Sequence, residues 1–200
     1  MLGRNLRNMK KEVTNFLDDV KKVSEELKGQ SSSIEKVISI LKNVKDKDHT
    51  VFICGNGGSA GTAIHMTADL FKIAGIKTIC LNDNIPLVSA LTNDEGWSDI
   101  YEYQLQRLYE YGDVLITISV HGGTGEDKAG QWSQNLNKAI AYVKLNSGTN
   151  IGFSGFDGGQ MKNNCDVCIV IPAESTPLVE SFHVILHHLI TFALQEGNRK

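Results

Sequence analysis

From residue 50 onward, short apolar runs alternate with longer amphipathic stretches, and this alternation constrains the fold of the chain more than any other feature. Apolar runs span 50–54, 76–81, 113–119, 149–154 and 166–171, and stretches with helical spacing span about 59–74, 97–109, 131–146 and 175–196. Buried strands that alternate with helices form a parallel sheet covered on both faces. The sequence therefore predicts an α/β fold, a three-layer sandwich around a five-stranded parallel sheet flanked by helices.

Two helices are predicted before the first strand, within residues 1–48. Apolar residues recur at helical spacing over 4–28 and again from 32 to about 44. Their apolar stripes need a partner, and two interpretations stand: the helices pack on the domain, or they build a subunit interface. We expect residues 1–48 to be an N-terminal helical oligomerisation segment and residues 49–200 to hold the α/β unit, in one structural domain.

Composition narrows the class of protein. The chain has 200 residues, a net charge of -3 and 41% hydrophobic residues, which is ordinary for one globular domain. No basic stripe favours nucleic acid, and no apolar run approaches the ~18 residues that a membrane span needs. The N-terminus has no apolar signal-peptide core. These features predict a cytoplasmic protein that binds neither nucleic acid nor membrane.

Two of the four cysteines, Cys165 and Cys168, form a C-x-x-C pattern that leads into an apolar run. The pattern therefore indicates a strand, in which residues three apart point to opposite faces. That placement suits neither a metal pair nor a redox pair, so we expect the cysteines to be structural.

A glycine-rich loop, Cys-Gly-Asn-Gly-Gly-Ser over 54–59, joins the first strand to a helix. Gly57 and Gly58 allow positive φ and a close approach of the backbone to a ligand. Free N–H groups at the helix N-terminus favour an anion. The alternative is a tight strand–helix turn without a ligand, but such a turn needs fewer glycines. The spacing Gly55-x-Gly57-x-x-Ala60, with Asp83 after the second strand, also fits a relaxed dinucleotide fingerprint, so a nicotinamide-dependent oxidoreductase is a competing hypothesis.

Two helices carry residues that suit acid–base or metal chemistry. His65 and Asp69 share a face at i, i+4, and such a pair can hold a metal or relay a proton. In the last helix, Glu180 and His188 lie eight residues apart and fall on nearly one face. Two further histidines of that helix, His183 and His187, are expected to be satisfied core or interface residues. A ligand with its anion at the glycine loop would present a carbon to His65 and Asp69, which suits a phosphorylated sugar.

Several ordered motifs resemble the phosphoheptose isomerases of the sugar-isomerase (SIS) domain family, whose domain is flavodoxin-like. The resemblance covers about 50–195 and is carried by the loop 54–59 with His65 and Asp69, by Asn93-Asp94-x-Gly96-x-x-Asp99, by 112–119, by Asp157-Gly158-Gly159 and by the Glu180…His188 helix. It implies aldose–ketose isomerisation, such as sedoheptulose 7-phosphate to D-glycero-D-manno-heptose 7-phosphate, in heptose biosynthesis. It also implies a homotetramer with active sites shared between subunits.

The resemblance assigns roles residue by residue. Asp69 and His188 are implied as the catalytic proton-transfer pair, and His65, Asp69, Glu180 and His188 as the ligands of one Zn²⁺ per active site. The residues expected to contact the substrate are Asn56, Gly57, Gly58, Ser59, Asn93, Asp94, Ser119, Val120, His121, Gly122, Thr124, Ser133 and Glu180.

Three departures from the family pattern bear on these roles. The family usually has Glu where this chain has Asp69 and Gln where it has Glu180, so this chain offers two histidines and two carboxylates to a metal. Its phosphate loop, Ser119 to Ser133, holds an insertion, with Val120 and His121 in place of two hydroxyl residues. The altered loop motivates a second hypothesis, a non-catalytic sugar-phosphate sensor or a partner-binding protein on the same fold.

Overall fold

The protein is described by a computed structural model over residues 6–123 and 133–195. Its helices are α1 (Leu6–Leu27), α2 (Ser31–Asp46), α3 (Gly58–Asp69), α4 (Ile85–Asp94), α5 (Ile100–Leu108), α6 (Gln134–Leu145), α7 (Gly159–Asn164) and α8 (Thr176–Ala193). A 3₁₀ turn, η1 (Lys28–Gln30), joins α1 to α2, and a π-helical turn, η2 (Leu70–Ala74), follows α3. The strands are β1 (Thr50–Gly55), β2 (Lys77–Cys80), β3 (Val114–Ile118), β4 (Thr149–Ser154) and β5 (Val167–Val170).

The five strands form one sheet in the order β2-β1-β3-β4-β5, and every neighbouring pair is parallel. Strands β1, β3 and β4 are almost wholly buried, as strands covered on both faces must be. The order reverses between β1 and β3, and in open parallel sheets ligands bind outside the carboxyl ends of the strands at such a point. The predicted five-stranded parallel sheet is confirmed.

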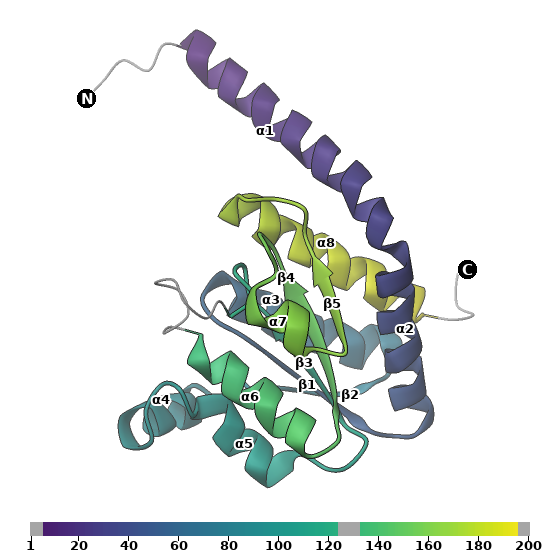
Figure 1. Ribbon diagram of the computed structural model, residues 1–200, viewed down its shortest axis with the longest axis vertical. Helices are drawn as coiled ribbons and strands as arrows, with labels where there is room; N and C mark the ends of the chain where they lie inside the picture. Colours follow the sequence, from purple (N-terminus) through teal and green to yellow (C-terminus); the bar gives the residue numbers. More distant parts are fainter. Residues whose placement is uncertain (1–5, 124–132, 196–200) are drawn as a thin grey trace.

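Helices cover both faces of the sheet (Figure 1). One core joins residues of α2, α3 and α8 to one face, and a second core joins residues of α5 and α6 to the other. The predicted three-layer sandwich is therefore confirmed, and α3 and α8 lie in the same layer.

The two N-terminal helices differ in how they meet the rest of the chain. Four apolar residues of α2 (Ile34, Val37, Leu41 and Val44) are buried in the first core, together with Val23 and Leu27 near the end of α1. The first half of α1 instead projects away from the domain (Figure 1), and its Met9, Val13, Phe16 and Leu17 are exposed. Packing on the domain is thus observed for α2 and the end of α1 only.

The sequence pattern did not predict two short helices, α4 and α7. The helix α4 follows Asn84, whose side-chain oxygen accepts a hydrogen bond from the N–H of Leu87 at 3.1 Å, with Pro86 in the first turn. Asparagine at the N-cap followed by proline is a helix start signal, but α4 has little apolar periodicity because it buries only Leu91. The helix α7 is six residues long, too short for a period to register.

The expectation that Cys165 and Cys168 point to opposite faces is wrong. Cys165 ends α7 in an extended conformation and precedes β5, so strand alternation does not relate it to Cys168. Both sulfurs lie against Gly152 of β4, at 3.1 and 3.0 Å from where a Cβ on that glycine would stand. Both are free thiols, and burial raises the pKa of Cys165 to about 12, so that thiol stays protonated at neutral pH.

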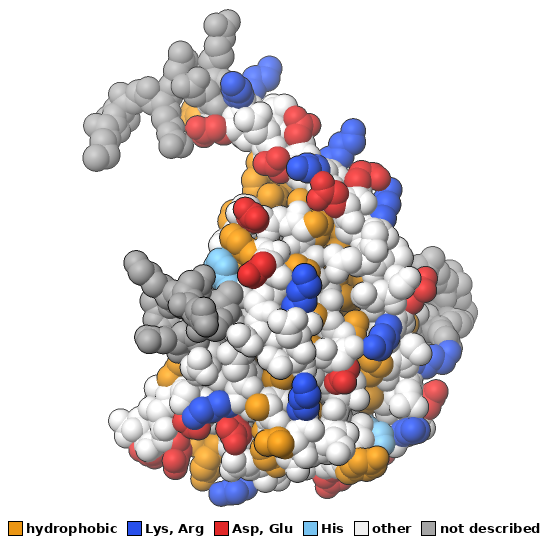
Figure 2. All heavy atoms as spheres, in the orientation of Figure 1, with side chains coloured by type: hydrophobic (Ala, Val, Ile, Leu, Met, Phe, Trp, Pro, Cys, Tyr) orange, Lys and Arg blue, Asp and Glu red, His pale blue; other side chains and the backbone are white. Residues whose placement is uncertain are grey.

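Acidic and basic side chains intermix over the face of the molecule shown in Figure 2. Among the described residues, no helix combines the length and apolar character that crossing a bilayer requires.

Candidate active site

The glycine-rich loop lies at the carboxyl end of β1 and opens α3. Gly57 has φ 58° and ψ −126°, a conformation that residues with a Cβ rarely adopt. At Gly55, a Cβ would stand 2.7 Å from the carbonyl oxygen of Ser59. Both glycines are therefore required by the sharp turn, in which the N–H groups of Ser59 and Ala60 donate to the carbonyls of Asn56 and Gly57 at 3.1 and 3.0 Å. The turn brings the N-terminus of α3, the positive end of its dipole, to the carboxyl edge of the sheet.

Two residues that the sequence did not single out hold this turn in place. Asn82 accepts a hydrogen bond from the N–H of Gly55 at 3.1 Å and donates to the Gly55 carbonyl at 2.9 Å. The Tyr101 hydroxyl donates to the same carbonyl at 2.6 Å and accepts from Asn82 at 2.7 Å. Asn82 lies two residues after the end of β2, and its place at the carboxyl edge of a strand was the signal that could have marked it.

A pocket of about 380 Å³ opens beside the loop. Its lining is Asn56, Gly57, Ser59, Trp97, Ser119, Val120, His121 and Ser133. Every lining residue except Trp97 was expected from the sequence to contact the substrate. Serine hydroxyls, loop amides and one aromatic ring suit a small polar molecule with an anionic group.

His121 and Gly122, which follow β3, pack against residues that follow β4. The imidazole of His121 packs on the Phe156 ring with centroids 4.3 Å apart. The Gly122 carbonyl accepts the N–H of Met161 at 2.9 Å, and the backbone of Gly122 passes so close to Gly158 that a side chain has no room. His121 therefore forms part of the pocket wall, and Gly122 supports that wall.

Other expected contact residues lie elsewhere. Asn93 and Asp94, at the end of α4, are exposed and hydrogen-bonded to each other, with 2.7 Å between Nδ2 and Oδ1. Gly58 is the first residue of α3 and, like Gly122, is not part of the pocket lining. Thr124 lies outside the described residues.

The expected site on α3 and α8 is assembled around one carboxylate oxygen. Oδ2 of Asp69 lies 3.4 Å from Nε2 of His65, 3.3 Å from Nε2 of His187 and 3.6 Å from Nε2 of His188. The three rings contact one another, with His187 and His188 centroids 4.0 Å apart. The four ligand atoms lie within 4.8 Å of one another, so three of the four expected metal ligands come together.

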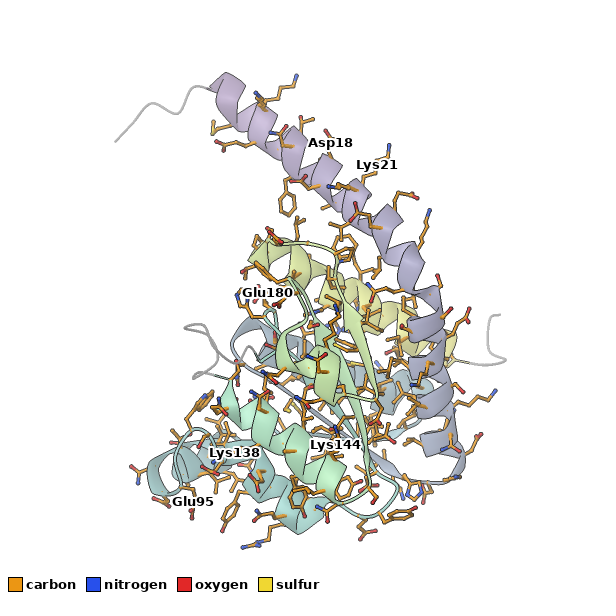
Figure 3. All side chains as sticks on the ribbon, viewed as in Figure 1. Asp18, Lys21, Glu95, Lys138, Lys144 and Glu180 are labelled. Atoms are coloured by element: carbon orange, nitrogen blue, oxygen red, sulfur yellow. The ribbon has the colours of Figure 1, made fainter. Side chains whose placement is uncertain are left out.

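In this cluster of side chains, His187 stands where Glu180 was expected. Glu180 is not in the group: its carboxylate lies beside Gly58 at the start of α3, where a Cβ on the glycine would stand 2.5 Å from Oε1. Figure 3 shows Glu180 leaving the first half of α8, seven residues before His187. His187, expected to be a core or interface residue, is buried and yet faces Asp69. The reason is that α3 and α8 run parallel, so the start of α8 meets the start of α3.

Burial sets the charge state of two histidines on α8. Desolvation lowers the pKa of His183 and of His187 to about 4, so both imidazoles are neutral at pH 7. For His187, the neighbouring His188 and His65 lower the pKa further, and Asp69 opposes them. A neutral imidazole is the form that binds a metal, and three imidazoles with one carboxylate are a donor set that fits Zn²⁺.

The fold and the site are those of an α/β protein that presents a pocket with several serine side chains at the carboxyl edge of its sheet. Comparison with known families matches residues 15–126 to the SIS domain. The chain belongs to the SIS-domain family and, with its phosphoheptose isomerase relatives, to the isomerase enzymes.

Individual relatives support this assignment. The phosphoheptose isomerase of Helicobacter pylori is 30% identical over 180 residues, 88% of this chain and 89% of the relative. Lincomycin biosynthesis protein LmbN of Streptomyces lincolnensis is 40% identical over 154 residues, 72% of this chain, and the match spans 55% of LmbN's length. The structure of phosphoheptose isomerase GmhA from Neisseria gonorrhoeae superposes with a TM-score of 0.84 at 22% identity, covering 94% of this chain and 100% of that one, which shows the same fold.

Proposed function

We propose that the chain catalyses the aldose–ketose isomerisation of a sugar phosphate, with sedoheptulose 7-phosphate as the first candidate substrate and D-glycero-D-manno-heptose 7-phosphate as its product. The observation that carries the proposal is the position of Asp69 on the helix that begins at the pocket. The names of the phosphoheptose isomerase relatives support the substrate class.

The pocket would hold the anionic group of the substrate. Ser59, Ser119 and Ser133 offer hydroxyls there, and the positive end of the α3 dipole favours a phosphate. Asp69 lies ten residues after Ser59 on α3, which is about 15 Å at 1.5 Å per residue. An extended sugar phosphate bound along this helix would carry its carbonyl end toward the His/Asp cluster.

Isomerisation through an enediol needs one group to move a carbon-bound proton and another to serve the two oxygens. We assign the first role to Asp69, which removes the proton from C1 of the ketose and returns it to C2. We assign the second role to His188, whose imidazole is partly exposed and passes a proton between the oxygens at C2 and C1. No electrons leave the substrate, so this step needs no redox cofactor.

A divalent cation, with Zn²⁺ as the proposed ion and one per site, would be held by His65, Asp69 and His188. When bound there, such an ion polarises a carbonyl and stabilises an enediolate. Because the three imidazoles already face the Asp69 carboxylate, the residues fit the ion without a new element of structure.

The assay is incubation of the purified protein with ketose phosphates of five, six and seven carbons, with and without zinc, and with products resolved by NMR. We expect turnover of sedoheptulose 7-phosphate and its loss in Asp69→Asn and His188→Ala, with unchanged circular dichroism. Absence of turnover with every substrate would overturn the proposal. Tight sugar-phosphate binding without turnover, or capture of a specific partner protein, would favour the non-catalytic alternative. Binding of a nicotinamide cofactor would favour the oxidoreductase.

We further propose that residues 1–48 serve assembly and that the enzyme is a homotetramer with shared active sites. The exposed apolar residues on the first half of α1 support this assignment, because their stripe has no partner among the described residues of this chain. Sedimentation of the whole chain should give a tetramer, and Phe16→Glu with Leu17→Glu should lower the assembly state. A monomeric wild-type protein would contradict the assignment.

A further inference from the structure

We infer that His187 is a ligand of the divalent cation, in the place that the sequence pattern assigns to Glu180. The inference rests on the metal site in the proposed function and adds a residue to it. It makes the donor set three imidazoles and one carboxylate, instead of two imidazoles and two carboxylates.

The spacing of the donor atoms supports a tetrahedral site. For metal–ligand bonds of about 2.0–2.1 Å, the edge of a tetrahedron is about 3.4 Å long. The three edges that join Oδ2 of Asp69 to Nε2 of His65, His187 and His188 are 3.4, 3.3 and 3.6 Å. Three of the six separations among the four donors thus match those that one tetrahedral ion imposes, and all four ligand atoms lie within 4.8 Å of one another.

The burial of His187 also points to a ligand. Its side chain is fully buried, and its one hydrogen-bond contact among the described residues joins Nε2 to Asp69. Its Nδ1 is buried without a partner in that part of the chain, and so is Oγ1 of Thr191, one turn further along α8. An imidazole buried only to fill space costs more than an apolar side chain of similar size. Binding a cation through Nε2 gives this buried group a favourable interaction.

The position of the Glu180 carboxylate also favours His187 as the fourth ligand. Its carboxylate lies against Gly58, at the opposite end of α3 from Asp69. In this arrangement, the cation is held by three neutral imidazoles and one carboxylate, which leaves a net charge of about +1 at the site. A site with two carboxylates would be neutral, so His187 makes the ion a stronger attractant for a developing enediolate.

Zinc affinity, measured by competition with a chromophoric chelator, separates the two ligand sets. We expect His187→Leu, which keeps an apolar side chain of similar size in the core, to weaken zinc binding by more than about 100-fold, because removing a direct ligand exceeds the effect of removing an outer partner. The matched variant Glu180→Ala should change the affinity by less than about threefold. Urea unfolding of the metal-free proteins checks folding, and we expect His187→Leu to be at least as stable as the wild type, since it removes a buried unpartnered polar atom.

A second measurement uses the unmodified protein, so it does not depend on any variant folding. X-ray absorption of the zinc-loaded wild type should count three imidazoles, and the cobalt-loaded protein should show the intense visible bands of a tetrahedral ion. Two imidazoles, or loss of affinity in Glu180→Ala but not in His187→Leu, would overturn the inference. So would a wild-type protein that takes up neither zinc nor cobalt in equilibrium dialysis. The isomerase assay is independent of these readouts, so failure here is distinguishable from failure of the proposed activity.

Discussion

Asn56 in the glycine-rich loop and Asn135 at the start of α6 exchange two hydrogen bonds through their side-chain amides, at 3.0 and 2.9 Å. Asn56 Oδ1 also accepts from the Tyr101 hydroxyl at 3.1 Å. The Asn56 amide, expected from the sequence to bind substrate, is thus already engaged within the protein. It connects the loop after β1 to α6, which follows the segment from Ser119 to Ser133, so the two sides of the pocket are held together.

The substitution Asn135→Ala tests the contribution of these Asn56–Asn135 hydrogen bonds. Asn135 is fully buried, and its loss leaves the Asn56 amide with an unmet hydrogen bond, so we expect unfolding in urea to lose about 1–3 kcal/mol. We also expect the KM for the sugar phosphate to rise more than kcat falls, because the pocket walls separate while Asp69 and His188 stay in place. An equal loss in both kinetic parameters would mean that Asn135 acts on the chemistry instead.

Gly122→Ala should be among the most damaging single-methyl substitutions. Gly122 has φ +63°, and a Cβ there would stand 2.0 Å from the carbonyl oxygen of Gly158, which is backbone and cannot rotate away. We expect a loss of at least about 2 kcal/mol of stability in urea unfolding, together with weaker substrate binding. The control is Gly61→Ala, at an exposed position in α3 with open space around it, which should stabilise the protein by roughly 0.5–1 kcal/mol. Equal effects of the two substitutions on stability would contradict the close approach of Gly122 to Gly158.

The acid stability of the protein should depend on His183. Burial lowers its folded pKa to about 4, whereas the unfolded residue titrates near its ordinary pKa of about 6.5. The unfolded state therefore binds more protons between these values, so stability is retained above pH 6.5 and lost as the pH falls from 6.5 to 4. His183 should account for about 3 kcal/mol of that loss. Urea unfolding at pH 7 and pH 4.5 should show a smaller difference for His183→Gln, which keeps an N–H donor for the Ser154 carbonyl. The same pH dependence in both proteins would place the titration elsewhere.

Trp97 should report directly on pocket occupancy. Its ring lines the pocket and is 42% exposed, so a sugar bound there would displace water from the indole. In a Trp132→Phe background, Trp97 is the one remaining tryptophan of the two in the chain. Titration with a sugar phosphate should then shift or quench its fluorescence, and inorganic phosphate should compete. An unchanged spectrum at saturating substrate would mean that the substrate lies away from this ring.

Local sequence patterns predicted most of the fold because they reflect short-range physics. Four of the five residues of strand β3 are apolar because both of its faces are covered, and that pattern is visible without a structure. The pattern failed where an element is short or barely buried, as in α4 and α7. It also failed at Cys165, where the chain changes from helix to strand within two residues and strand alternation no longer applies.

The candidate site was likewise predicted only in part from the sequence. The i, i+4 spacing of His65 and Asp69 follows from one helix, and the structure brings both side chains to the cluster as expected. The choice between Glu180 and His187 on α8 could not be made in this way. Glu180 and His187 lie seven residues apart, so at about 100° per residue they fall on nearly the same face of α8, and periodicity cannot choose between them. His187 becomes part of the cluster because the face of α8 that it occupies is covered by α3.

The sequence by itself determined that this chain forms a parallel α/β sandwich with a glycine-rich turn after its first strand, because strand and helix periods and glycine's freedom at positive φ are local properties. Only the tertiary structure decided that His187 joins His65 and His188 around Asp69, where the Glu180 carboxylate lies, and that Asn56 binds Asn135. Those relationships depend on the register in which α3, α6 and α8 pack across the sheet, and that register comes from contacts between residues far apart in the chain.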